Sequence, residues 1–109
     1  MLPEELREDL VKALRTTFGT RITAIVLYGS MARGDQTPES DIDIALFLRD
    51  PMTREEREEM ISRLVDLDWK YDREVSVCEI QQSQFAEWAD ILPFYRNIQE
   101  EGVTLWTAA

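Results

Sequence analysis

Histidine is absent from this chain of 109 residues, and cysteine occurs once, at Cys78. Without an imidazole, the chain lacks the general base of serine–histidine and cysteine–histidine mechanisms, and it lacks a usual zinc ligand. A single cysteine excludes a disulfide bond within the chain. We therefore exclude enzymes that depend on these groups, and we interpret Cys78 as a small buried apolar residue.

Long apolar runs are also lacking, because no run approaches the ~20 residues that cross a bilayer as a helix. The first residues do not show the basic segment followed by an apolar stretch that is typical of a secretory leader. The sequence therefore predicts a cytoplasmic protein without a membrane partner.

Basic residues are few, since 12 lysines and arginines face 22 acidic residues and the formal net charge is −10. Such a chain repels a polyanion, so we expect no direct contact with nucleic acid. The length fits one domain, residues 1–109, without a second lobe. Repeats, low-complexity tracts and internal linkers are not evident.

What is present is an alternation of helical and strand patterns. Leu6, Leu10 and Leu14 recur every four residues before Gly19, which predicts an amphipathic helix from residue 3 to 18. Thr53 and Glu56 form the T-x-x-E pattern of a helix start. The further elements expected are strands at 21–28, 41–48, 74–80 and 103–106, and helices at 31–34, 53–69, from Ser83, and 94–101 after a break at Pro93. The order predicts an α/β (α+β) fold with a mixed three- to four-stranded sheet backed by helices.

Two groups of large apolar residues on these helices are expected to be buried in a core or an interface. The first group is the stripe Met60, Ile61, Leu64, Val65 and Leu67, and the second is Trp69, Trp88, Phe94 and Tyr95. None of the aromatic residues is assigned to base recognition.

Two aspartates one residue apart, Asp41 and Asp43, open the expected strand 41–48. Alternate residues of a strand point to the same face, so these carboxylates lie side by side while Ile42 and Ile44 face the core. They repel each other unless a cation lies between them, and Mg²⁺ is typically held by one or two carboxylates together with phosphate oxygens. A Gly29-Ser30 turn upstream offers backbone N–H groups to those phosphates. The pattern predicts an enzyme that acts on nucleotide phosphates.

The segment GSMARGDQTPESDIDI, residues 29–44, resembles the signature of the nucleotidyltransferase superfamily related to DNA polymerase β, G-S-x-A-R-G followed by S-D-x-D. The order of elements on either side, including EEGV near the end, is similar to the small core fold of that family. At this length the chain looks like a minimal nucleotidyltransferase (MNT), many of which are antitoxins paired with a HEPN ribonuclease toxin. The resemblance implies an enzyme with a polymerase β-like core.

The resemblance also implies roles for individual residues. The Ser30 hydroxyl and the backbone N–H groups around Gly29 and Ser30 would bind the triphosphate of ATP. Arg33 would contact the β- or γ-phosphate, with pairing to a carboxylate of the sheet as the alternative. Asp41 and Asp43 would bind two Mg²⁺ ions. In the connecting loop, Ser40 is interpreted as a turn residue, and Asp35 and Glu39 as solvent-facing charges.

A third carboxylate is common in this family, usually an aspartate on a neighbouring strand. Glu74 in EVSV fits that placement, so the resemblance implies that Glu74 is a metal ligand and a possible general base. Asp72 is the alternative, and the alternation places Glu79 on the opposite face with the valines. A plain exposed charge at the end of a strand is the other interpretation of Glu74.

The function implied is transfer of AMP from ATP, with Mg²⁺, to a tyrosine hydroxyl of a partner HEPN toxin. Two alternatives stay open. The first is an antitoxin that neutralises its partner by binding alone, and the second is a nucleotidyltransferase for a small molecule such as an aminoglycoside. The transferred nucleotide and the oligomeric state, homomeric or heteromeric, are not determined by the sequence.

Overall fold

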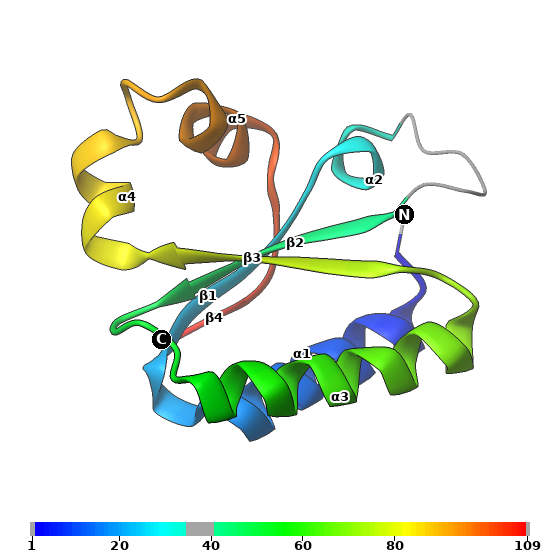
Figure 1. The fold of residues 1–109 in the computed structure, drawn as a ribbon. Helices are drawn as coiled ribbons and strands as arrows, with labels where there is room; N and C mark the ends of the chain where they lie inside the picture. The colour runs from blue at the N-terminus through cyan, green and yellow to red at the C-terminus, as the bar shows by residue number, and fades with distance from the viewer. Residues whose placement is uncertain (1, 35–40, 109) are drawn as a thin grey trace.

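The computed structural model describes residues 2–34 and 41–108, and within them the helices and strands follow the expected order (Figure 1). The elements are α1 Glu4–Phe18, η1 Gly19–Arg21, β1 Ile22–Tyr28, α2 Ser30–Arg33, β2 Ile42–Leu48, α3 Arg54–Tyr71, β3 Val75–Gln81, α4 Gln82–Trp88, α5 Pro93–Glu101 and β4 Val103–Thr107. The loop of residues 35–40, with Asp35, Glu39 and Ser40, lies outside the described residues.

The four strands form one mixed sheet in the order β3-β2-β1-β4. β1 pairs antiparallel with both β2 and β4, whereas β2 and β3 are parallel. A parallel pair needs a crossover connection, and α3 provides it. The expected α/β fold with a mixed sheet of three to four strands is confirmed, with four strands.

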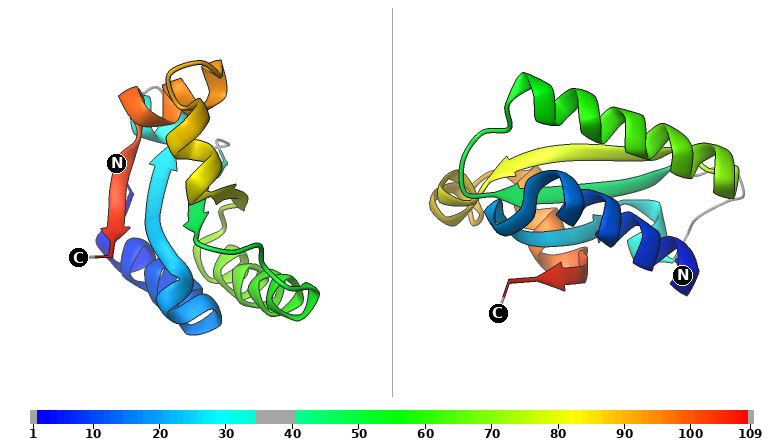
Figure 2. Two further views of the ribbon diagram at one scale, coloured as in Figure 1. Left: turned by 90° about the vertical axis from the view of Figure 1, so that its left-hand side faces the viewer. Right: turned by 90° about the horizontal axis from the view of Figure 1, so that it is seen from below.

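α1 and α3 pack side by side against one face of the sheet, as both views of Figure 2 show. The main core lies in this layer, where the leucines of α1 meet Ile42 and Ile44 of β2, and all of these are buried. A smaller cluster on the opposite face joins Val26, Ala45 and Phe47 to Ile98 of α5. Ala45 and Phe47 alternate with the buried isoleucines, so β2 contributes to both layers.

Helix α3 begins as expected, because the Thr53 hydroxyl accepts from the Glu56 N–H and the Glu56 carboxylate accepts from the Thr53 N–H. It ends at Tyr71, two residues later than predicted. The expected stripe is wrong in part, since Ile61 and Val65 are exposed. The buried residues of α3 are Met60, Leu64 and Leu67.

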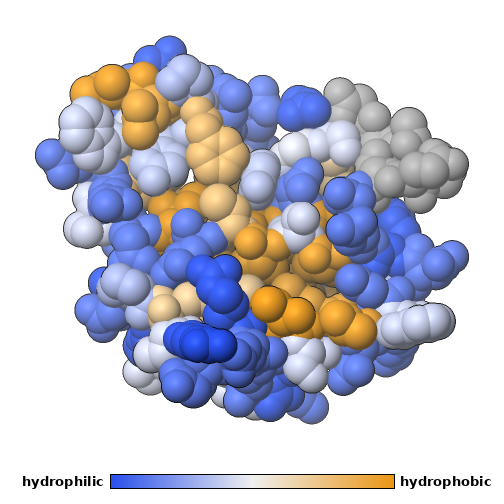
Figure 3. All heavy atoms as spheres, viewed as in Figure 1, coloured by the Kyte–Doolittle hydropathy of each residue, from blue (hydrophilic) through white to orange (hydrophobic). Residues whose placement is uncertain are grey.

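Trp69, Trp88 and Phe94 do not lie in the core of the chain, because Trp69 is 84% exposed and the other two are exposed as well. Tyr95 packs against the smaller cluster, as expected. Ser83 does not cap α4, which begins at Gln82 without a side-chain cap. The expected break before the last helix is present, and α5 begins at Pro93, one residue earlier than predicted, because the fixed φ of proline suits a first helical turn. Figure 3 shows apolar atoms at the surface near the turn between α4 and α5.

Across the described residues, none of the helices combines the length and the apolar character needed to cross a membrane.

Candidate active site

The turn between β1 and α2 forms the expected strand-to-helix connection. Gly29 has φ 76° and ψ −156°, a conformation that disfavours any side chain, and its carbonyl accepts from the Ala32 and Arg33 N–H groups, each at 3.1 Å. Ser30 is the first residue of α2 and is half-buried. Gly34, with φ 82°, ends the helix.

Asp43 lies directly against this turn. Asp43 pairs with Tyr28 in the β1–β2 register, so its carboxylate is next to the residue that follows Tyr28. A Cβ atom built on Gly29 would lie 2.5 Å from Oδ2 of Asp43, which is closer than real Cβ contacts allow. The glycine is therefore required both by its backbone conformation and by the carboxylate that fills the space.

Asp41 and Asp43 occupy the positions expected from the sequence. Asp41 is exposed immediately before β2, and Asp43 is half-buried at its second residue. Burial raises the pKa of Asp43, the negative charge of Asp41 raises it further, and the positive charge of Arg33 opposes both. The two carboxylates thus interact unfavourably, and a divalent cation between them removes this penalty. The donor set and its electrostatics fit Mg²⁺.

The structure does not assemble Glu74 with the two aspartates. In residues 2–34 and 41–108, no group of three or more histidine, cysteine, aspartate or glutamate side chains is placed to hold a metal ion. The backbone of Glu74 is nearby, since its carbonyl accepts from the Ile42 N–H at 2.8 Å, and its side chain is exposed. The residue of β3 that the register sets beside Asp43 is Ser76.

The two other acidic residues near β3 have separate surroundings. Asp72 ends α3 with a left-handed φ of 52° and borders, with Glu74, a depression at the start of β3. Glu79 accepts hydrogen bonds from the Met52 N–H at 2.8 Å and from Gln81 Nε2 at 2.9 Å. It therefore connects β3 to the start of α3, away from the aspartate pair.

Arg33 lies between the aspartate pair and α5. Its Nη1 atom is 3.6 Å from Oε2 of Glu101, the last residue of α5, and both side chains are partly exposed. The guanidinium also acts electrostatically on Asp43. A guanidinium next to the turn is of the chemical type that binds a phosphate.

Two residues that the sequence analysis did not assign flank Asp43 on the sheet, Tyr28 on β1 and Ser76 on β3. Burial raises the pKa of Tyr28, and the charges of Cys78 and Asp43 add to the effect. The Tyr28 ring meets Phe94 edge-to-face with centroids 5.5 Å apart. Because Tyr28 directly precedes Gly29 in the sequence, its position near the site could have been predicted. The position of Ser76 depends on the pairing register of β2 and β3, which no local sequence pattern reveals.

Taken together, a strand-to-helix turn, a carboxylate pair and an arginine converge at one end of the sheet. This set of groups can bind a polyphosphate and a divalent cation.

Comparisons with known proteins agree with that chemistry. The family model described as Polymerase beta, Nucleotidyltransferase matches residues 8–107. A Methanocaldococcus jannaschii protein named "Putative protein adenylyltransferase MJ0604" is 34% identical over 109 residues, covering 97% of this chain and 100% of that protein.

Solved structures of similar fold include a chain of the complex between a tri-AMPylated Shewanella oneidensis HEPN toxin and an MNT antitoxin. It has a TM-score of 0.62 and 20% identity, over 96% of this chain and 72% of that one. Spectinomycin adenyltransferase AAD(9) from Enterococcus faecialis, solved with ATP and spectinomycin, has a TM-score of 0.68 and 18% identity, over 94% of this chain and 48% of that one. The match to the family model extends over nearly the whole chain, and the chain therefore belongs to the polymerase beta nucleotidyltransferase family.

Proposed function

We propose that this protein transfers AMP from ATP, with Mg²⁺, to a tyrosine hydroxyl of a HEPN-type toxin and thereby acts as its antitoxin. The observation that carries the proposal is the placement of the Asp43 carboxylate against the Gly29 turn, with Asp41 beside it. A phosphate bound to the turn amides lies next to both carboxylates. The name of the Methanocaldococcus relative and the AMPylated toxin in the similar solved structure support a protein acceptor.

In this proposal the chain's own groups position the nucleotide. The amides at Gly29 and Ser30, with the Ser30 hydroxyl, bind triphosphate oxygens, and Arg33, which also pairs with Glu101, contacts the β- or γ-phosphate. Asp41 and Asp43 hold one or two Mg²⁺ ions. When bound, Mg²⁺ neutralises the triphosphate and lowers the pKa of the attacking hydroxyl.

Glu74 is the proposed third carboxylate. Its backbone is hydrogen bonded to Ile42, the residue between the two aspartates, and its exposed side chain has room to turn toward a bound ion. Such a side chain would serve as a metal ligand or as the base for the acceptor hydroxyl. Asp72 is the alternative third carboxylate, and single substitutions at the two positions distinguish between them.

The test is an incubation of the protein with ATP, Mg²⁺ and a HEPN-type toxin, followed by mass spectrometry of the acceptor. We expect added AMP on a tyrosine, and we expect Asp41→Asn to abolish it. Asp50→Asn is the matched control, since Asp50 is exposed beyond the far end of β2. An acceptor that stays unmodified beside active wild-type protein would refute the proposal.

Neutralisation by binding alone is the second candidate, favoured by the exposed apolar residues Ile91, Leu92 and Phe94 around the α4–α5 turn. Rescue of cells from the toxin separates the two. Equal rescue by wild type and Asp43→Asn would favour binding, whereas lost rescue with an intact complex would favour transfer. An aminoglycoside acceptor is the remaining alternative, and drug modification in the absence of any partner protein would support it.

A further inference from the structure

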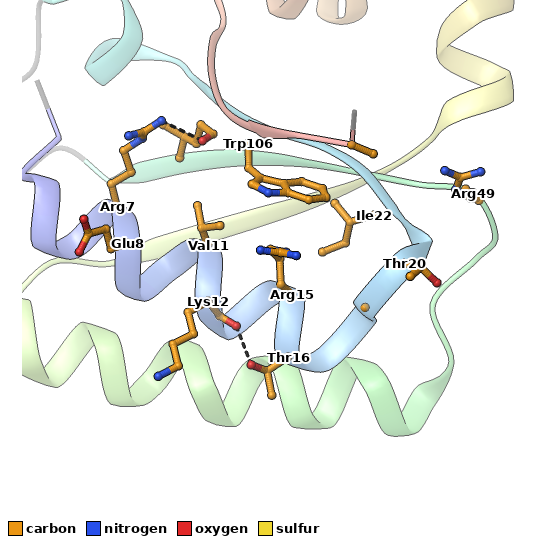
Figure 4. Close-up of a pocket in the computed structure, with 13 residues that line it drawn as sticks. Arg7, Glu8, Val11, Lys12, Arg15, Thr16, Thr20, Ile22, Arg49 and Trp106 are labelled. Atoms are coloured by element: carbon orange, nitrogen blue, oxygen red, sulfur yellow. Dashed lines mark hydrogen bonds between the residues drawn. The ribbon is translucent and has the colours of Figure 1, made fainter.

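A second hollow runs alongside α1, from Arg7 near the start of the helix to Thr20 beyond its end. It has a volume of about 790 Å³ and lies between α1 and β4. Val11, Ile22, Leu105 and Trp106 contribute apolar surface to it. In Figure 4 the Trp106 ring projects from β4 toward Arg15 on α1. None of the residues proposed to bind nucleotide or metal lines this groove.

The charge of this groove is opposite to that of the chain. Four cationic residues line it, Arg7, Lys12, Arg15 and Arg49, against the single carboxylate of Glu8. The chain as a whole has 22 acidic and 12 basic residues, so a third of its cations gather here. If acidic and basic residues were evenly mixed over the surface, each cation would have carboxylates beside it. The groove therefore carries a local positive potential on an acidic protein.

Three of the four cations of the groove form no salt bridge among the described residues. These are Lys12, Arg15 and Arg49, although Lys12 acts electrostatically on Asp9, whereas Arg7 pairs with Glu4 at 3.4 Å. Arg15 instead lies over the Trp106 ring, with its guanidinium carbon 4.7 Å from the ring centroid. Arg7 donates to the Leu105 carbonyl at 2.9 Å. The guanidinium and ammonium groups thus keep hydrogen-bonding capacity for an external anion.

The spacing of the cations indicates what kind of anion can contact all of them. Arg7, Lys12 and Arg15 extend along eight residue steps of α1, about 12 Å at 1.5 Å per residue. Arg49 follows at the far end of the groove (Figure 4). One phosphate or carboxylate cannot contact all four side chains. A ligand that matches the groove carries several anionic groups in a row and apolar groups for the floor.

We propose that this groove binds an acidic segment of a partner protein, in which carboxylates alternate with apolar side chains along an extended backbone. The carboxylates of such a segment can pair with the cations, and its apolar side chains can contact Val11 and Trp106. β4 is an edge strand of the sheet, and its residues Leu105 and Trp106 line the groove. Nucleic acid fits less well, because it has no aliphatic groups for the floor and is repelled by the net charge of −10.

The test uses fluorescence anisotropy of a short fluorescein-labelled peptide that alternates glutamate and leucine. We expect binding that weakens with added salt, and we expect Lys12→Gln, Arg15→Gln and Arg49→Gln each to weaken it by roughly two- to fivefold, as for exposed ion pairs. Arg54→Gln is the matched control, since Arg54 is exposed at the start of α3 and outside the groove. The same peptide with glutamine in place of glutamate should not bind.

A second measurement locates the peptide. The chain has three tryptophans, and in the variant Trp69→Phe/Trp88→Phe only Trp106 remains as a fluorescent reporter. Peptide binding should then change the Trp106 emission. The proposal is overturned if no peptide binds, if binding is unaffected in Lys12→Gln/Arg15→Gln, if Trp106 emission stays constant, or if a single-stranded oligonucleotide displaces the peptide. These outcomes do not depend on nucleotidyl transfer, because the residues changed here are different from those proposed to bind nucleotide and metal.

Discussion

The α-carbon of Gly29 and the carboxylate of Asp43 are so close that a single added methyl group would lie 2.5 Å from Oδ2 of the aspartate. The contact joins the turn that presents backbone amides to the strand that presents the carboxylate pair. Because β1 and β2 are antiparallel and Tyr28 pairs with Asp43, the end of one strand and the start of the next share this space. The nucleotide and metal functions proposed above both depend on this junction.

Gly29→Ala should therefore damage both stability and the site. A side chain at φ 76° costs roughly 1–2 kcal/mol by itself, and the clash with Asp43 raises the cost to about 3 kcal/mol. Gly34→Ala measures only the cost of an ordinary left-handed conformation, because Gly34 has φ 82° and ψ 10° and nothing within 4 Å of its added Cβ. The contact itself is measured by Gly29→Ala in an Asp43→Ala background, where urea unfolding should show a smaller loss than in the wild type. Equal losses in the two backgrounds would mean that strain alone, and no contact with Asp43, requires glycine at position 29.

Asp43 should make the metal-free protein less stable as the pH rises. Its pKa is raised above the ordinary value of 3.8, by burial first and then by Asp41. A carboxyl with a raised folded-state pKa stabilises the fold while protonated, and this stability is lost as the pH rises from about 3.8 through the folded-state pKa. At neutral pH, Asp43→Asn should then raise the melting temperature in EDTA by a few degrees.

Magnesium should reverse this order. Mg²⁺ should raise the melting temperature of the wild type and leave Asp43→Asn unchanged, because a ligand stabilises a fold by its affinity for that fold. Asp50→Asn, on an exposed residue, should behave as the wild type in both buffers. A wild type that gains nothing from Mg²⁺ would contradict the assignment of the aspartate pair as a metal site.

Single substitutions should separate the two candidates for the third carboxylate. If Glu74 is a ligand, Glu74→Gln lowers the affinity for Mn²⁺ by roughly tenfold, and Asp72→Asn leaves it unchanged. Titration calorimetry with Mn²⁺ measures this without turnover. If Asp72→Asn lowers the affinity instead, Asp72 is the third ligand. If neither substitution changes the affinity, only Asp41 and Asp43 hold the ion.

Ser76→Asp is expected to strengthen metal binding. The register sets Ser76 beside Asp43, so a carboxylate there joins the pair directly, whereas Glu74 lies one residue before the start of β3. Because three negative charges then lie close together, the metal-free protein should lose stability, whereas the affinity for Mn²⁺ should increase. Cys78→Ser, one step further along the same face, is the control substitution. Unchanged affinity in Ser76→Asp would argue that the ion is bound away from β3.

Arg33 should matter to nucleotide binding much more than to stability. The Arg33–Glu101 pair is exposed, so breaking it should change the free energy of unfolding by less than about 1 kcal/mol. Arg33→Gln should nevertheless weaken binding of an ATP analogue by about tenfold, as loss of a charge-assisted contact predicts. Glu101→Gln removes the competing carboxylate and should keep or increase the affinity. Equal weakening by both variants would show that the ion pair acts through the fold.

The sequence analysis succeeded where the deciding signal is local. The four-residue spacing of leucines gave α1, the Thr53–Glu56 pattern gave the start of α3, and alternation placed Asp41 and Asp43 on one face. It failed where distant segments decide. Ile61 and Val65 fit a helical stripe but lie beyond the surface that α1 and the sheet cover. The Ser76–Asp43 register and the Arg33–Glu101 pair join residues far apart in the chain, so no local spacing could reveal them.

The most direct test of the central claim is a crystal of this protein grown with Mn²⁺ and a non-hydrolysable ATP analogue, measured by anomalous scattering. The account predicts a manganese peak bridging the carboxylates of Asp41 and Asp43, with the triphosphate against the amides at Gly29 and Ser30. A manganese ion bound elsewhere, or a nucleotide bound away from the Gly29 turn, would contradict it.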